Sequence, residues 1–251
     1  MKSKFIIIMT LLITGFNAHA DDEWQFKLEP YVMFTNISGD ADNGRASGVD
    51  LNLDFSTILE NLEMAAMLRA EALHHSGWGA TIDYGFMDLG QKKSSQRNGY
   101  LDASLRQGIF EALGFYRYEL SNGYIDYMAG IRWWDNDISI TLDSAIFPGS
   151  LNADIEEDWV DVIGAVRLRQ RLLENLYFIG RADIGGFGVE SDFTSGLELG
   201  VDYQLSETMT LVVKYRGIWV EYDNEEPINT PERFSYDTVT HGPIVALAFD
   251  F

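Results

Sequence analysis

The chain of 251 residues contains no cysteine and only five prolines. The absence of cysteine excludes a disulfide-stabilised scaffold, a cysteine nucleophile and thiolate metal sites. Basic residues are scarce, because 18 Lys and Arg stand against 39 Asp and Glu; the net charge of -21 argues against nucleic-acid binding. Beyond the first twenty residues no run of roughly 18 apolar residues occurs, so no transmembrane helix is expected. The 15 Phe, 12 Tyr and 6 Trp exclude a disordered coil.

The first twenty residues have the pattern of a secretory signal peptide. Lys2 and Lys4 precede an apolar run over residues 5–16, and Ala18-His19-Ala20 follows as a small-x-small cleavage site. The apolar run is too short for the ~20 residues that span a bilayer. We therefore expect residues 1–20 to be removed and residues 21–251 to form a single domain.

The rest of the chain alternates between apolar and polar residues with a period of two, which is the pattern of half-buried strands. In one segment, for example, Met209, Leu211 and Val213 alternate with polar residues such as Thr210 and Lys214. The phase is lost between residues 107 and 111, which predicts a β-bulge there. Ten strands are predicted in this way, over residues 24–36, 62–75, 78–89, 100–119, 124–135, 158–171, 176–187, 193–204, 208–222 and 236–251.

The connections alternate between short and long. Short turns are expected at 75–77, 120–123, 173–175 and 205–207, and long loops at 37–61, 90–98, 138–157, 188–192 and 224–235. This alternation predicts an all-β fold, a transmembrane up-and-down antiparallel β-barrel of about ten strands, with eight or twelve as alternatives. In the first long loop, residues 56–61 loosely match a capping box and predict a short helix, which could fold into the lumen. Alternatively, residues 49–55 form a further strand.

Period alone does not tell a membrane barrel from a soluble one, because both alternate. Two features favour the membrane barrel. Aromatic residues gather near the ends of the strands, as the girdles at two membrane interfaces require. In addition, a soluble ten-stranded barrel would have to enclose every large apolar side chain, which would overcrowd its interior. We therefore expect the apolar faces to meet lipid and the charged faces to line the lumen.

The predicted lumen carries charges of both signs, which must pair or contact water in an interior of low dielectric. A barrel of about ten strands is far narrower than a 16-stranded porin, so we expect a closed or very narrow lumen. Paired charges would make a structural protein, and a water path would set ion selectivity. The predicted lumen charge network comprises Arg69, Glu71, Asp126, Arg132, Asp161, Arg167, Arg169, Arg171, Arg181, Asp183, Lys214 and Arg216.

The chain ends in VALAFDF, with Phe249 and Phe251 at alternate positions. This ending resembles the C-terminal strand signal of Gram-negative outer-membrane β-barrels. Residues 182–192, 130–134 and 59–62 resemble a family of small outer-membrane barrel proteins of unassigned function. The resemblance implies an outer-membrane location and Phe249 and Phe251 as the membrane-insertion signal. It implies outer-membrane lipid, lipopolysaccharide and the barrel-assembly machinery as partners, and it assigns no catalytic residue, metal or cofactor.

An outer-leaflet hydrolase acting on lipid A or peptide is one alternative function. His74, His75 and Ser76 invite it, but alternation places the two histidines on opposite faces beside a short, periplasmic turn. Omptin proteases are ten-stranded barrels with acidic pairs and a histidine near the outer rim. Here His241 is expected near that rim, but its parity faces lipid, so this hypothesis is weaker.

A surface-loop binding protein or adhesin is the other alternative. Residues 40–44 echo a calcium-binding loop, but Gly44 and Arg45 stand where the motif needs a ligand and a glycine, so a flexible polar loop is the better interpretation. Acidic runs at 156–158 and 223–226 could hold divalent cations at the lipopolysaccharide surface. Solvated acidic loops are the more common explanation of such runs.

Overall fold

The structure is a computed structural model, and it describes residues 23–43, 46–94, 100–143, 150–226, 230 and 233–251. The predicted signal peptide lies outside these residues. Among them no helix is long and apolar enough to cross a membrane. The elements are β1 (Trp24–Met33), β2 (Asn36–Asn43), β3 (Ala46–Leu53), α1 (Phe55–Asn61), β4 (Leu62–His74), β5 (Trp78–Ser94), β6 (Tyr100–Leu120), β7 (Gly123–Asp143), β8 (Ser150–Arg171), β9 (Leu176–Gly186), β10 (Phe193–Gln204), β11 (Met209–Asp223) and β12 (Phe234–Asp250).

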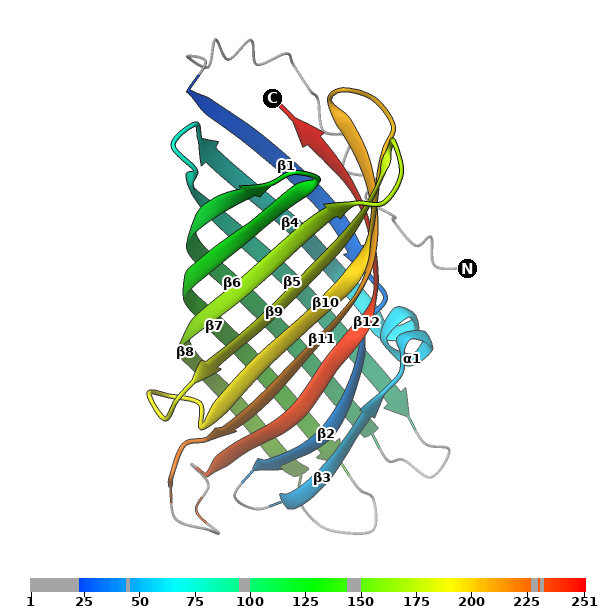
Figure 1. The fold of residues 1–251 in the computed structure, drawn as a ribbon. Helices are drawn as coiled ribbons and strands as arrows, with labels where there is room; N and C mark the ends of the chain where they lie inside the picture. Colours follow the sequence, from blue (N-terminus) through cyan, green and yellow to red (C-terminus); the bar gives the residue numbers. More distant parts are fainter. Residues whose placement is uncertain (1–22, 44–45, 95–99, 144–149, 227–229, 231–232) are drawn as a thin grey trace.

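Ten of these strands close into an antiparallel barrel. β1 pairs with β4, the strands from β4 to β12 pair in sequence order, and β12 returns to β1. The short connections, the start of β1 and the end of β12 lie at one end of the barrel, here called the short-turn end (Figure 1). The opposite end, toward which the strands lead to the longer connections, is called the long-loop end. The predicted barrel of about ten antiparallel strands is thus confirmed.

The outer and inner faces of the barrel wall differ in polarity, as the sequence predicted. Along β11, the side chains of Val213, Tyr215 and Trp219 are exposed on the outside, whereas Lys214 and Arg216 are buried in the lumen. The same alternation runs along the neighbouring strands, so the outer surface is apolar and the lumen is polar. A water-soluble barrel has the opposite arrangement.

Several strands are longer than predicted. β5, β7 and β8 have 17, 21 and 22 residues, so they extend into segments expected to be loops. The acidic run at 156–158 therefore lies inside β8 and not in a loop. The predicted bulge is also wrong, because β6 pairs with β5 and β7 without a register shift. The phase looked broken because Leu113 and Phe115 are apolar residues that face the lumen and are buried there.

The first predicted loop, 37–61, instead contains two strands and a helix. β2 continues the line of β1 and pairs with residues 234–241 of β12, and β3 pairs with β2. The expected flexible loop at 40–44 was therefore wrong, because residues up to Asn43 belong to β2. The predicted helix is present as α1, and the Asp54 side chain accepts a hydrogen bond from the Thr57 N–H at 2.8 Å. It lies beside the barrel wall and not in the lumen (Figure 1).

Candidate functional site in the barrel lumen

A belt of charged residues lines the inside of the barrel in two runs of cross-strand partners. From β1 to β8, direct cross-strand partners are Glu29, Arg69, Asp83, Glu111, Arg132 and Asp161. From β9 to β11, the partners are Arg181, Glu198 and Arg216. The two runs are offset where β8 meets β9, because the β8 partner of Arg181 is Arg167 and not Asp161. The side chains of both runs point into the lumen, where their charges meet.

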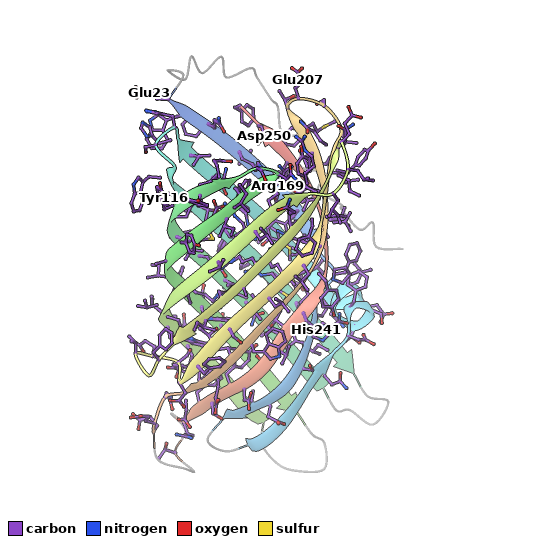
Figure 2. The ribbon with its side chains drawn as sticks, viewed as in Figure 1. Glu23, Tyr116, Arg169, Glu207, His241 and Asp250 are labelled. Carbon is purple, nitrogen blue, oxygen red and sulfur yellow. The ribbon has the colours of Figure 1, made fainter. Side chains whose placement is uncertain are left out.

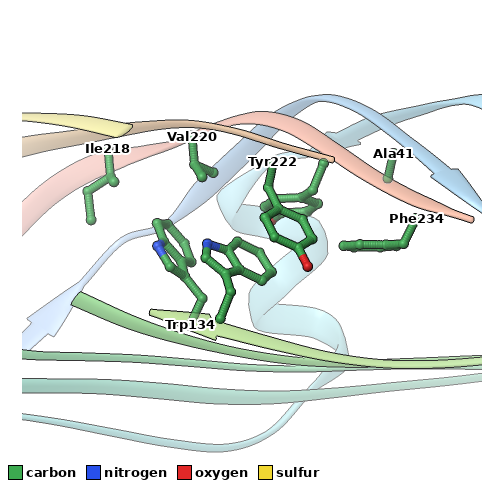
Figure 3. Packing of buried hydrophobic residues seen from close by; sticks show 8 residues of the cluster. Ala41, Trp134, Ile218, Val220, Tyr222 and Phe234 are labelled. Atoms are coloured by element: carbon green, nitrogen blue, oxygen red, sulfur yellow. The ribbon is translucent and has the colours of Figure 1, made fainter. Parts of the chain in front are cut away.

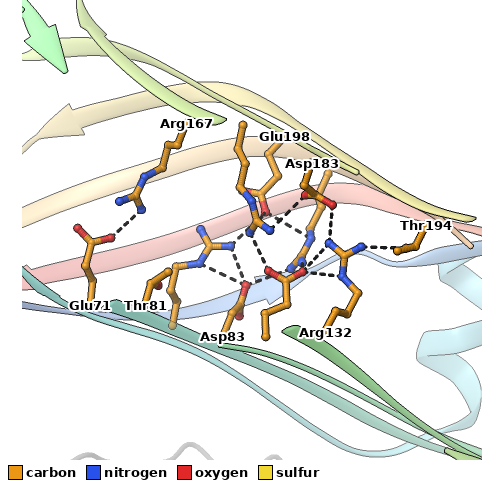
Figure 4. Close-up of polar contacts among 12 residues, drawn as sticks. Glu71, Thr81, Asp83, Arg132, Arg167, Asp183, Thr194 and Glu198 are labelled. Carbon is orange, nitrogen blue, oxygen red and sulfur yellow. Dashed lines mark hydrogen bonds and ion pairs between the residues drawn. The ribbon is translucent and has the colours of Figure 1, made fainter. Parts of the chain in front are cut away.

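The contacts of this belt cross the full width of the lumen (Figure 4). Arg132 of β7 lies 2.7 Å from Glu111 and 2.8 Å from Asp183 of β9. Glu111 also pairs with Arg181 and Arg216, each at 2.8 Å. These atoms are shielded from solvent, and Arg132 is 0% exposed. We call the connected set the central ion cluster; it consists of Glu29, Arg69, Asp83, Glu111, Arg132, Arg181, Asp183, Glu198, Lys214 and Arg216.

The charges of the central ion cluster cancel. It holds five cations, which are Arg69, Arg132, Arg181, Lys214 and Arg216, and five carboxylates, which are Glu29, Asp83, Glu111, Asp183 and Glu198. Buried ions are tolerated when partners and hydrogen bonds compensate their desolvation. A neutral cluster leaves no surplus charge to attract a passing ion.

A smaller ion cluster lies nearer the short-turn end. The Asp126 carboxylate of β7 forms ion pairs with the guanidinium groups of Arg117 at 2.8 Å and Arg167 at 2.5 Å. The Glu71 carboxylate pairs with the same two guanidinium groups. The Arg117 guanidinium also stacks 3.6 Å from the ring centroid of Tyr124. Next to it, at the short-turn end, a polar chamber is lined by residues that include Lys27, Glu29 and Asp202.

Toward the long-loop end the lumen is filled by aromatic side chains (Figure 3). The ring of Trp159 stacks on Tyr222 with 4.1 Å between centroids, and on Trp134 with 5.6 Å. We call this buried cluster the aromatic layer; it consists of Ala41, Trp134, Trp159, Ile218, Val220, Tyr222, Phe234 and Tyr236. The polar chamber, the ion clusters and the aromatic layer therefore follow one another along the axis.

The twelve residues predicted to line the lumen do not all join one network. Asp161 forms no ion pair with the residues that the structure describes; it accepts hydrogen bonds from the Trp134 indole and from Ser191. Arg169 pairs with Asp202 at 3.0 Å, and Arg171 is exposed beside the Tyr177 hydroxyl. The remaining nine lie in the two ion clusters. Sequence reasoning left out their partners Glu29, Asp83, Glu111, Arg117 and Glu198.

The terminal residues lie where the barrel closes. Phe249 is the direct partner of Leu28 on β1. The Phe251 N–H donates to the Phe26 carbonyl at 2.9 Å, and the Phe26 N–H donates back to the Phe251 carbonyl at 3.2 Å. The last residues therefore complete the closing pair of strands.

The two neighbouring histidines lie together at the short-turn rim. Their rings are 4.1 Å apart, so the expected placement on opposite faces was wrong. His74 Nδ1 lies 2.7 Å from Ser76 Oγ, and its Nε2 lies 3.6 Å from a Glu23 carboxylate oxygen. One potential ligand atom from each of Glu23, His74 and His75 also falls within 4.8 Å of the other two, so these residues could hold a metal ion.

The same turn lacks the other half of an acyl-transfer site. Such a site needs free N–H groups that stabilise an oxyanion. Here the His75 N–H donates to the Glu23 carbonyl, the Ser76 N–H to His74 Nδ1, and the Gly77 N–H to the His74 carbonyl. All three donors of the described turn are engaged, so the Ser–His pair is a turn-stabilising contact.

His241 lies in the middle of β12 and not near the outer rim as expected. Its parity is as predicted, because it faces outward, where Nδ1 lies 2.6 Å from the Tyr215 hydroxyl. Figure 2 shows it beside α1, on the outer side of the wall, away from the lumen charges. Within the described part of the chain it contacts Tyr215 and Asn36, and neither of these is acidic.

Comparison with solved structures returns barrels of low sequence identity. The outer membrane protease OmpT from Escherichia coli is 9% identical with a TM-score of 0.47, covering 92% of this chain and 98% of that chain. The translocator domain of autotransporter NalP from Neisseria meningitidis is 12% identical with a TM-score of 0.42, covering 93% and 90%. The attachment invasion locus protein Ail of Yersinia pestis is 9% identical with a TM-score of 0.38, covering 91% and 99%. No family model matches the chain, and no curated protein matches it.

Proposed function

We propose that the chain is an integral outer-membrane β-barrel protein whose lumen is sealed along its axis, and that its role is structural rather than that of a pore. The observation that carries this proposal is the neutral central ion cluster, in which Arg132 is fully buried between Glu111 and Asp183.

The outer surface supports insertion into a membrane. Aliphatic residues such as Leu199 and Val213 are exposed around the middle of the wall, and aromatic residues such as Trp78 and Trp219 are exposed toward the two ends. Tyr116, for example, points outward near the short-turn end (Figure 2). An apolar band between aromatic girdles is the surface of a barrel in a bilayer. The proposed partners are therefore membrane lipid, lipopolysaccharide at the long-loop end, and the barrel-assembly machinery that would read Phe249 and Phe251.

The lumen supports a structural role because it is closed twice. The central ion cluster fills one level and the aromatic layer fills the next, so a solute would have to break buried ion pairs and displace stacked rings. A conducting pore instead keeps its charges against water. The polar chamber at the short-turn end is a recess that stops at the ion clusters.

Planar-bilayer recording tests this proposal. We expect the folded protein to produce no discrete current steps, whereas the double variant Glu111→Ala, Trp159→Ala, which removes one large side chain from each layer, leaks. Each single variant should stay closed, because the other layer still seals the lumen. The proposal would be contradicted if the unaltered protein produced current steps and if the ion selectivity of these steps changed in the variant Glu111→Gln. Such a result would show an open pore.

The hydrolase hypothesis receives less support. The rim turn offers a Ser76–His74 contact but no free oxyanion donor among its backbone N–H groups. We propose no catalytic residue. Binding of divalent cations or of a surface partner through the long-loop end stays a prediction.

A further inference from the structure

The barrel wall has a break in its hydrogen-bonded ladder on one side. β1 and β4 pair from Trp24–His74 up to Pro30–Leu68 and then separate. From this point toward the long-loop end, β4 continues along β5, while β1 and β2 continue along β12. Over residues 62–67, no described strand pairs with the edge of β4 that faces β1. We call this break the lateral seam.

Exposure along β4 marks the same place. Residues 63–66 are exposed on both faces of the strand, although Ala65 has the parity of the inward-facing Arg69. At the seam itself the backbone N–H of Met33 donates a hydrogen bond to the Met67 sulfur, with 3.2 Å between nitrogen and sulfur. A thioether is a weak acceptor, so this contact replaces a ladder bond poorly.

A cavity lies directly behind the seam. Its floor is the central ion cluster, through Asp83, Glu111 and Arg216, and Ile218 of the aromatic layer borders it on the other side. Between them the lining is apolar and adaptable, with Met33, Met67, Met87 and Ile109.

The outside of the seam is apolar as well. Val32 and Met64 flank it on the outer surface and are 57% and 55% exposed. Helix α1 stands next to it, where Ile58 packs among Ile37, Met87 and Leu89. Phe55 is held by the Asn36 side chain, whose oxygen accepts the Phe55 N–H at 2.9 Å. The helix thus covers the part of the opening nearer the long-loop end and leaves the methionine pair on the side of the short-turn end.

We propose that the lateral seam admits a single-chain amphiphile, such as a fatty acid, from the surrounding lipid into this cavity. The acyl tail lies against the methionine side chains, whose flexible thioethers adapt to a chain of variable shape. The polar head group hydrogen-bonds to the unpaired edge of β4, whose backbone groups would otherwise be unsatisfied in hydrocarbon. The ion-paired floor is neutral and gives the tail no passage along the axis. The inference rests on the proposed location in a membrane.

A photoreactive fatty acid tests it, namely a dodecanoic acid with a diazirine at the end of its tail, added to the full protein in lipid nanodiscs. After irradiation, mass spectrometry maps the labelled residues. We expect labels on Met33, Met67 and Met87 in the cavity. We also expect labels on the apolar outer surface, here called the outer belt, at residues such as Leu199 and Val213.

Two matched pairs of variants make the assay specific. Gly85 faces the cavity, and a Cβ there meets its nearest atom, the Tyr31 hydroxyl oxygen, at 3.4 Å, so Gly85→Leu fills the space without a backbone clash. Gly164→Leu adds the same side chain where nothing lies within 4 Å of the new Cβ. Cavity labelling should fall by about tenfold or more in Gly85→Leu and not in Gly164→Leu. Met67→Trp, with Leu68→Trp as its control, repeats the comparison.

The outcomes separate the two proposals. Belt labelling without labels on the cavity residues, or cavity labels that Gly85→Leu and Met67→Trp leave unchanged, would overturn the lateral site and leave the membrane barrel intact. Absence of belt labelling in protein that still migrates as a folded barrel would overturn the membrane location and the lateral site with it.

Discussion

The guanidinium of Arg132 lies 2.7 Å from the carboxylate of Glu111, its direct cross-strand partner, at the centre of the barrel. Glu111 binds three guanidinium groups at once, from β7, β9 and β11. This one carboxylate therefore links strands that are far apart in the wall, and its removal affects the whole cross-section.

Replacing Glu111 by Gln keeps the shape of the side chain but leaves three buried guanidinium groups with one negative charge fewer. We expect a loss of about 3–5 kcal/mol in the free energy of unfolding, as for other buried pairs that lose one partner. Urea unfolding in lipid vesicles, followed by tryptophan fluorescence, measures it. Asp250→Asn is the control, because the Lys27–Asp250 pair at the rim spans 3.5 Å and is partly exposed; we expect less than about 1 kcal/mol there. Equal effects would argue against a closed central cluster.

Truncating Trp159 to Ala removes the central ring of the aromatic layer. Trp159 is buried and contacts both Tyr222 and Trp134. We expect a destabilisation of about 3–5 kcal/mol, because the neighbouring rings cannot collapse into the space. The same substitution at Trp78, which is exposed at the short-turn rim, should cost clearly less. Similar costs at both positions would contradict a packed lumen.

A charge on the outer face tests contact with lipid. Val213 is 42% exposed on the outer side of β11. In a bilayer, Val213→Arg should cost about 2–4 kcal/mol near the midplane, whereas Leu205→Arg, at the short-turn end, should cost about 0–1 kcal/mol. Unfolding titrations in vesicles compare the two variants. If Val213→Arg were as harmless as Leu205→Arg, the outer face would be in water.

The N-cap of α1 predicts a pH dependence. The Thr57 N–H and the Ser56 hydroxyl donate to the Asp54 carboxylate and lower its pKa below the ordinary value for aspartate. Since the pKa is lower in the folded state, the stabilisation is complete above the unfolded value of about 3.9 and is lost as the pH falls through the folded value. Hydrogen exchange of residues 55–61 should therefore speed up, relative to intrinsic rates, below that pH.

Variants separate the charge of Asp54 from its capping geometry. Asp54→Asn keeps an acceptor and should retain protection of α1 while removing the pH dependence; Asp54→Ala should lose both. Unchanged exchange in Asp54→Ala would mean that packing of Ile58 alone holds the helix.

The ten barrel strands could be predicted from sequence because each has one apolar and one polar face, as in β11. β2 was not predicted, because residues 36–43 carry few apolar residues. β3 was anticipated only by the alternative strand over residues 49–55, where Val49, Leu51 and Leu53 alternate with polar residues. β2 pairs with β12 and β3 pairs with β2 beyond the closed wall. A strand there does not separate lipid from the lumen, so it does not need one apolar and one polar face. The helix was predicted because Ser56 and Glu60 loosely match a capping box, although the structure has its N-cap at Asp54. Its place beside the wall depends on contacts with Met87 and Leu89 that are remote in sequence.

The lumen residues were predicted in part for a similar reason. Parity placed Arg69 and Arg132 inside, and it applies equally to Asp83 and Glu111. What sequence did not supply was register: only the pairings Arg69–Asp83 and Glu111–Arg132 show that these acids are the partners of those bases. A search for opposite charges at matching distances from each short turn would have found them.

The distribution of the central cluster along the chain has a consequence for assembly. Strands β1 to β7 supply three carboxylates and two cations, which are Glu29, Asp83, Glu111, Arg69 and Arg132, while β9 to β11 supply two carboxylates and three cations, which are Asp183, Glu198, Arg181, Lys214 and Arg216. An open sheet therefore has an amino-terminal half with one negative charge too many and a carboxy-terminal half with one positive charge too many. Rolling up brings the Lys214 ammonium of β11 to Glu29 of β1 and cancels the imbalance. Electrostatic attraction between the two halves would thus favour the cylindrical form over any partly unrolled intermediate.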